Sequence, residues 1–200
     1  MIAEAPPHRK HEILDAACRV IARDGVAALR VADVAREAGV STALVHYYCD
    51  SRTRLVEEAF TRVDELADAA ATADFAKAGS ARGRLEHLLL AWSGADPTIR
   101  ASWAVWCELW QYAIRNEWAR ARVTESHQRW LDQIATLLEE GRSDGSLPRA
   151  IDGPAAARRL AACVDDWGRE MLVGMRGSEE VQAALLDAVA LEVAAAGRAA

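Results

Sequence analysis

The sequence predicts an all-α fold of about nine helices, with a three-helix N-terminal head on a larger helical body. Apolar residues recur at three- and four-residue steps along almost the whole chain, which is the spacing of amphipathic helices. The composition agrees, because 52% of the 200 residues are hydrophobic and only 5 are proline. A chain of this length can bury a substantial core, either in one domain or in a head and a body.

The first two helices are expected at 8–24 and 31–38. Gly25 and Gly39 follow them, and each glycine supplies the left-handed residue with which helices commonly end. One face of the first helix carries an apolar stripe at helical spacing, made of Ile13, Leu14, Ala17, Val20 and Ile21.

A third helix is expected at 42–48 and a fourth at 52–73. Ser41 and the pair Asp50-Ser51 precede them, and short polar side chains at such positions cap the first free N–H groups of a helix. The stretch 77–80 is the first clear break. The helices of the body follow at 81–93, 97–115, 117–142, 154–175 and 178–195.

Residues 31–48 carry the strongest functional pattern. Two short amphipathic helices meet there at a turn containing Gly39, as in a helix-turn-helix whose second helix enters a DNA major groove about 12 Å wide. Base contacts are expected from the outward positions of that second helix, which are Thr42, Ala43, His46 and Tyr47. The alternative interpretation is a helical hairpin inside a larger bundle.

Groups that suit phosphate surround this unit at the starts of its helices: Arg9, Lys10, Arg30, Ser41, Ser51, Arg52 and Arg54. The first 62 residues carry nine bases and nine acids. The net charge of -6 therefore comes from the rest of the chain, which holds 15 bases and 21 acids. An electroneutral head is compatible with DNA binding where its bases cluster.

The turn and its flanks read Asp33-Val34-Ala35-Arg36-Glu37-Ala38-Gly39-Val40-Ser41, followed by His46-Tyr47-Tyr48 and Ser51-Arg52. In this pattern the head resembles the TetR-type repressors. The resemblance implies phosphate contacts by Tyr47 and Arg52 and groove contacts by the face from Thr42 to His46. Three positions depart from the family pattern, because Arg30, His46 and Cys49 stand where threonine, tyrosine and phenylalanine are frequent.

The same resemblance implies a homodimer held by the last two helices, a pseudo-palindromic double-stranded DNA operator, and release by a small-molecule effector. It divides the chain into a helix-turn-helix DNA-binding domain at 1–52 and a ligand-binding and dimerisation domain at 53–200. Segment 103–147 resembles the choline-sensing, BetI-type branch of the family, without identifying the effector. Apolar positions on the last two helices agree with a dimer: Leu160, Val164, Trp167, Met171, Met175, Leu185, Leu186 and Val189.

Seven tryptophans are many for this length. Trp103, Trp106 and Trp110 share a helix face with Ile99 and Ile114, and the tryptophans expected to converge on this face are Trp92, Trp130 and Trp167. A packed core and a ligand cavity are both compatible with this pattern.

Acids flank Trp167 at Asp166 and Glu170. In a cavity, carboxylates beside indole rings favour a cation such as an amine or quaternary ammonium, while a neutral hydrophobic ligand is equally compatible. Glu108 points away from the tryptophan face and is expected to be a solvated charge.

Other functional classes lack support in the sequence. No glycine-rich phosphate loop, G-x-S-x-G or metal-spaced His/Cys cluster occurs, so an enzyme, a cofactor and a metal site are not expected. Cys49, beside the second helix of the motif, leaves a redox-responsive regulator open. A ligand-independent DNA-binding protein and an activator also stay open. The absence of a signal-peptide pattern and of a long uncharged apolar run predicts a cytoplasmic protein without a membrane partner.

Overall fold

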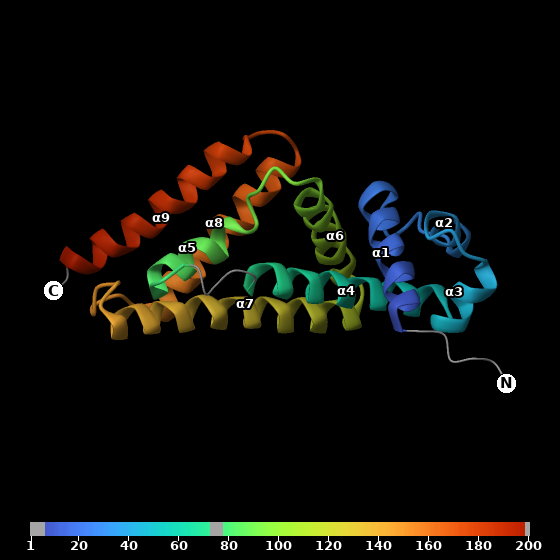
Figure 1. Ribbon diagram of the computed structural model, residues 1–200, viewed down its shortest axis with the longest axis horizontal. Coiled ribbons are helices and arrows are strands. Elements are labelled where there is room, and N and C mark those ends of the chain that lie inside the picture. Colours follow the sequence, from blue (N-terminus) through green and yellow to red (C-terminus); the bar gives the residue numbers. More distant parts are fainter. Residues whose placement is uncertain (1–6, 73–77, 199–200) are drawn as a thin grey trace. The chain divides into compact units, whose positions relative to one another are not determined.

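The computed structural model describes residues 7–72 and 78–198. In these ranges all regular structure is helical, which confirms the predicted all-α fold of nine helices (Figure 1). Among the helices of these ranges, none has the length and hydrophobicity that a membrane-spanning segment requires. The helices are α1 (Pro7–Asp24), α2 (Val31–Glu37), α3 (Thr42–Tyr48), α4 (Arg52–Thr72), α5 (Ala81–Leu90), α6 (Pro97–Ala113), α7 (Glu117–Asp144), α8 (Gly153–Leu172) and α9 (Ser178–Arg198).

Helix starts agree with the predicted ones to within one residue, whereas several ends differ by two or three. The predicted end of α8 at Met175 is wrong, because Gly174 adopts a φ of 78° and the Met175 N–H donates to the Glu170 carbonyl at 2.8 Å. This is a Schellman closure, which ends the helix at Leu172. The predicted end of α4 at Ala73 and the break residue Lys77 lie outside the described residues.

The chain forms two compact units, and the first comprises the described residues up to Ala67 together with Arg100–Val123. Its core contains the whole predicted stripe of α1, which is at most 5% exposed. Side chains from α6 and α7 complete the same core, among them Val105, Leu109, Ala119 and Val123. The core that supports the head is therefore built partly from residues distant in sequence.

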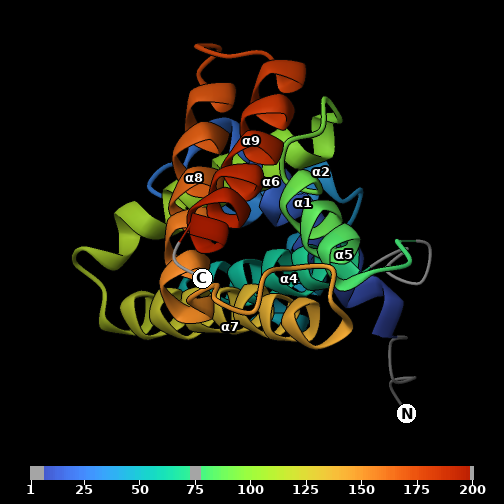
Figure 2. The same ribbon diagram turned by 90° about the vertical axis from the view of Figure 1, so that its left-hand side faces the viewer.

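The second unit comprises the described residues of the ranges 68–99 and 124–200. In it α8 and α9 lie side by side, as Figure 2 shows, and Arg159 of α8 makes two short contacts of 2.5 and 2.7 Å with the Glu192 carboxylate of α9. Asp152 caps α8 by accepting from the Ala155 N–H at 3.1 Å, and Pro154 occupies the first turn as predicted.

Candidate nucleic-acid interface

The turn between α2 and α3 is closed by backbone and side-chain hydrogen bonds. Gly39 adopts a φ of 65°, and the Val40 N–H donates to the Ala35 carbonyl at 2.9 Å, which completes a Schellman closure of α2. The Ser41 hydroxyl then accepts from the Leu44 N–H at 3.2 Å and caps α3. The two helices thus meet at a short turn with a defined geometry.

Helix α3 has one buried and one exposed face. Val45 is fully buried, and Leu44 and Tyr48 pack partly against the core of the first unit. The side chains predicted to point outward are all exposed, namely Thr42, Ala43, His46 and Tyr47, and so is the capping residue Ser41. The exposed face offers hydroxyl, methyl, imidazole and phenol groups, which are chemically suited to contacts with base edges and phosphate.

Most bases predicted to contact phosphate already have partners within the head. Arg9 pairs with Glu12 at 2.6 Å, and the Lys10 ammonium lies 2.5 Å from the Glu58 carboxylate. Glu58 also accepts from Arg54 at 2.8 Å. These carboxylates reduce the local positive charge, because each lies within ion-pair distance of the base that would meet a phosphate.

Arg52 and Ser51, at the start of α4, serve the fold of the head. The Ser51 hydroxyl caps α4 by accepting from the Arg54 N–H at 3.1 Å. Arg52 donates through Nε to the Leu29 carbonyl at 2.9 Å and through Nη2 to the Val26 carbonyl. Arg52 therefore holds the turn between α1 and α2, while Arg30 at the end of that turn is exposed.

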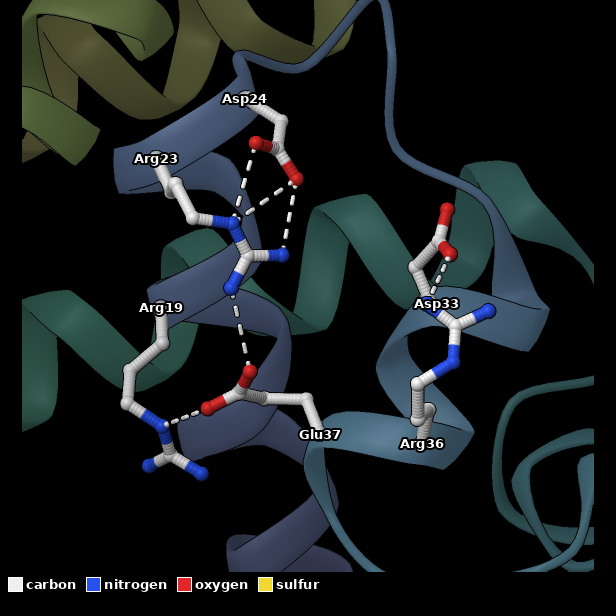
Figure 3. Close-up of polar contacts among 6 residues, drawn as sticks. All are labelled: Arg19, Arg23, Asp24, Asp33, Arg36 and Glu37. Carbon is white, nitrogen blue, oxygen red and sulfur yellow. Dashed lines mark hydrogen bonds and ion pairs between the residues drawn. The ribbon is translucent and has the colours of Figure 1, made fainter.

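An ion-pair network, missed by the sequence analysis, connects α1 to α2 (Figure 3). Glu37 of α2 accepts from Arg19 at 2.8 Å and from Arg23 at 3.2 Å, and Arg23 also contacts Asp24 at 2.9 Å. Hydrogen bonds from Arg19 and Arg23 lower the pKa of Glu37. The available signal was the i, i+4 spacing of the arginines on one face of α1, but the spacing does not identify their partner.

Cys49 lies at the end of α3, where its side chain is 1% exposed. Burial, and secondly the Glu58 carboxylate, raise the pKa of this thiol to about 11. Because the thiolate is the reactive form of cysteine, the alternative of a cysteine-based redox switch is not favoured.

The tryptophans predicted to line a ligand site fall in different units. Trp103, Trp106 and Trp110 belong to the first unit, and their burial decreases along α6. Trp103 is 6% exposed, Trp106 packs partly on the core, and Trp110 is 47% exposed. Ile114, predicted to continue this stripe, is 67% exposed and follows the end of α6, so the stripe does not extend to it.

In the second unit, Trp92 and Trp130 meet edge to face with ring centroids 6.3 Å apart. Trp167 of α8 is half-buried. The acids predicted beside it pair with arginines: Asp166 is exposed and lies 3.4 Å from Arg169, and Glu170 lies 2.5 Å from Arg176.

A different acid of this part of α8, Asp165, is half-buried and, unlike the half-buried Glu170, was not among the predicted acids. Burial raises its pKa, and nearby His127 of α7 and Arg169 act in the opposite direction. His127 precedes Trp130 by three residues, so both side chains share one face of α7. An acid, an imidazole and an indole pair thus belong to the second unit, and the sequence analysis missed both Asp165 and His127.

Glu108 of α6 also differs from its expected role as a solvated charge. The side chain is half-buried, and its Oε2 accepts from the backbone N–H of Val26 at 2.8 Å. The prediction considered only the tryptophan face of α6, whereas the opposite side of this helix packs into the head.

Comparisons with known proteins agree with this architecture. Residues 13–59 match the family of bacterial regulatory proteins described as the tetR family, and residues 81–195 match the C-terminal domain of BetI-type transcriptional repressors. The chain belongs to the TetR family, in its BetI-type branch, and is a DNA-binding transcriptional regulator. The family consists of transcriptional regulators rather than enzymes.

Individual relatives point the same way. The HTH-type transcriptional regulator BetI of Rhizobium meliloti is 34% identical over 160 residues, covering 80% of this chain and 75% of that one. A putative TetR-family regulator from Rhodococcus sp. superimposes with a TM-score of 0.82 at 29% identity, covering 92% and 98% of the two chains. A putative transcriptional regulator from Saccharomonospora viridis, solved in complex with choline, superimposes with a TM-score of 0.81 at 30% identity, covering 91% of this chain and 95% of that one.

Proposed function

We propose that this regulator is a homodimeric repressor that a small cationic effector releases from a pseudo-palindromic operator. The observation that carries the proposal is the division of α3 into a buried face and an exposed face behind a capped, glycine-closed turn. DNA binding is assigned to residues 1–52 and effector binding and dimerisation to 53–200. Thr42, Ala43 and His46 read bases, while Tyr47, Arg30 and the N-termini of the helices contact phosphate.

Exposed apolar residues on α9, the last helix, support the homodimer. Several residues that the sequence analysis assigned to the dimer are buried within the protomer, among them Leu160, Val164 and Leu185. Residues near them remain exposed, with Leu186 at 40% and Leu191 at 68%. A two-fold pair of α8–α9 units would cover these side chains and present two recognition helices to successive major grooves about 34 Å apart.

The chemistry of the second unit favours a cation over a neutral effector. Asp165 supplies a half-buried carboxylate, and the Trp92–Trp130 pair supplies aromatic surface that attracts positive charge. The choline complex of the Saccharomonospora viridis regulator supports the same chemical class. Release follows if the cation prefers a form of the dimer whose recognition helices do not match the operator.

Selection from fragmented genomic DNA of the source organism at about 150 mM salt tests operator binding. Enrichment of a few fragments that share a pseudo-palindrome is expected. Recovery of no enriched sequence at any salt concentration would refute specific DNA binding.

Effector class is then tested on the enriched fragment with choline and with 3,3-dimethylbutan-1-ol, its uncharged carbon analogue. Release by choline alone is expected. Equal release by both compounds would instead show a neutral hydrophobic site. Unchanged binding in the presence of several quaternary ammonium compounds and the alcohol would favour a ligand-independent DNA-binding protein.

A further inference from the structure

Two side chains from outside the helix-turn-helix hold the turn between α1 and α2. Helix α1 ends at Gly25, which has a φ of 80° and donates to the Ile21 carbonyl at 2.9 Å, as in an αL cap. The next N–H, that of Val26, donates to the Glu108 carboxylate. Arg52 holds the other side of the turn through the carbonyls of Val26 and Leu29.

The carboxylate of Glu108 fits closely against the turn. A Cβ atom added to Gly25 would lie 3.3 Å from both carboxylate oxygens, closer than an ordinary van der Waals contact. The position gains nothing from the helix dipole, because the C-terminal end of α1 carries partial negative charge and favours a cation. Its favourable interaction is the charge-assisted hydrogen bond to Val26, and such bonds are stronger than those between neutral groups.

The part of α6 that carries this carboxylate is packed into the core of the first unit. Val105 and Leu109, which flank Glu108 on α6, are each 1% exposed in the core shared with α1 and α2. A displacement of α6 therefore moves the carboxylate relative to Val26. The turn continues through Leu29 directly into α2, which begins at Val31.

We propose that Glu108 is a positioning residue for DNA binding, which fixes the turn at Gly25–Leu29 from α6 and thereby sets the position of α2. The inference rests on the proposed function, because it concerns how the recognition helix is held. Helix α2 packs on α3, so a shift at the start of α2 changes the orientation of the exposed face of α3. Movement of α6 then reaches the helix-turn-helix through this hydrogen bond as well, beside the packing of Val105 and Leu109 in the shared core and the covalent path through α4.

The test compares Glu108→Ala, Glu108→Gln and the control Glu65→Gln, which makes the same change of charge at a carboxylate with 56% exposed side chain in the same unit. Two quantities are measured: amide hydrogen exchange at Val26, and the Kd for the enriched operator fragment at a temperature where each variant is fully folded. For Glu108→Ala we expect faster exchange at Val26 and roughly tenfold weaker binding, about 1.4 kcal/mol. Glu108→Gln should lie between this variant and the wild type, because its amide oxygen still accepts from Val26, and Glu65→Gln should match the wild type.

A merely structural role would lower the melting temperature and leave the Kd of the folded protein unchanged, which would overturn the proposal. Wild-type exchange at Val26 in Glu108→Ala would overturn it as well. If Glu108→Ala does not fold, the same two measurements on Glu108→Gln decide whether Glu108 positions the turn for DNA binding. If the wild type enriches no DNA sequence, the proposed function fails, whereas exchange at Val26 still decides whether Glu108 fixes the turn.

Discussion

Replacing Gly39 with alanine isolates the backbone conformation of the helix-turn-helix turn. Gly39 has a φ of 65°, and a Cβ atom added there would meet nothing within 4 Å. The only cost of Gly39→Ala is therefore the left-handed conformation, about 1–2 kcal/mol for a residue with a Cβ. In a protein of this size, 1 kcal/mol lowers the melting temperature by about 2–4 °C, so a decrease of about 2–8 °C is expected.

Gly145 offers a matched control in the second unit. It has a φ of 79°, and a Cβ atom there would also meet nothing within 4 Å. Gly145→Ala should therefore lower the melting temperature by a similar amount. Only Gly39→Ala should weaken operator binding, because relaxation of its strained turn changes the relation between α2 and α3. The loss of affinity cannot exceed the strain released, which corresponds to about 5- to 30-fold.

Thermal unfolding followed by circular dichroism gives the melting temperature, and fluorescence anisotropy with the enriched fragment gives the operator affinity. An unchanged melting temperature in Gly39→Ala would show that the turn is not left-handed at this residue. Equal losses of affinity in Gly39→Ala and Gly145→Ala would show that binding depends on overall stability rather than on this turn.

Three further changes address single side chains. Glu37→Gln should destabilise the head slightly in low salt and have no effect in 1 M salt, because the contacts of Glu37 with Arg19 and Arg23 are exposed. Since the pKa of Glu37 is lowered, these contacts stabilise the head at neutral pH, and their contribution disappears as pH falls below the usual glutamate range. Melting curves recorded against pH and salt check both expectations. At pH values above the ordinary aspartate pKa, Asp165→Asn should be more stable than the wild type, because wild-type stability decreases as pH rises from the ordinary pKa to the raised pKa of Asp165. The same variant should bind choline more weakly in calorimetry. Stronger choline binding by the variant would exclude a charge contact. Treatment with peroxide should leave operator affinity unchanged, because the Cys49 thiol is buried and protonated; loss of binding that Cys49→Ser prevents would restore the redox alternative.

Features with local causes were predictable from the sequence. Gly39 and Ser41 act within four residues of their own positions, so the turn and the cap of α3 followed from residue type alone. The exposed face of α3 also followed, since the apolar positions Leu44 and Val45 determine which side of a short helix packs inward.

Long-range partners were not predictable in the same way. Arg52 matched a family pattern that implies phosphate contact, but its hydrogen bonds to Val26 and Leu29 depend on where the α1–α2 turn lies in space. Glu108 lies 82 residues from its partner in sequence. Periodicity identifies the face of a helix, but it does not state which backbone group of another helix lies opposite a given side chain.

The choice between Asp165 and its neighbour Asp166 shows how small residues determine the orientation of a helix. The stripe used for prediction consisted of large apolar residues, and it placed Asp166 and Glu170 on its flank. In the structure Ala161 and Gly168 are buried as well, four residues before and three residues after Asp165. These positions share one face of α8, so the buried face is centred nearer to Asp165 than the large residues indicated. Successive residues of an α-helix point about 100° apart, and Asp166 is consequently directed to Arg169 on the exposed side. For the proposed cationic effector, Asp165 is therefore the acid that we expect to contact the ligand.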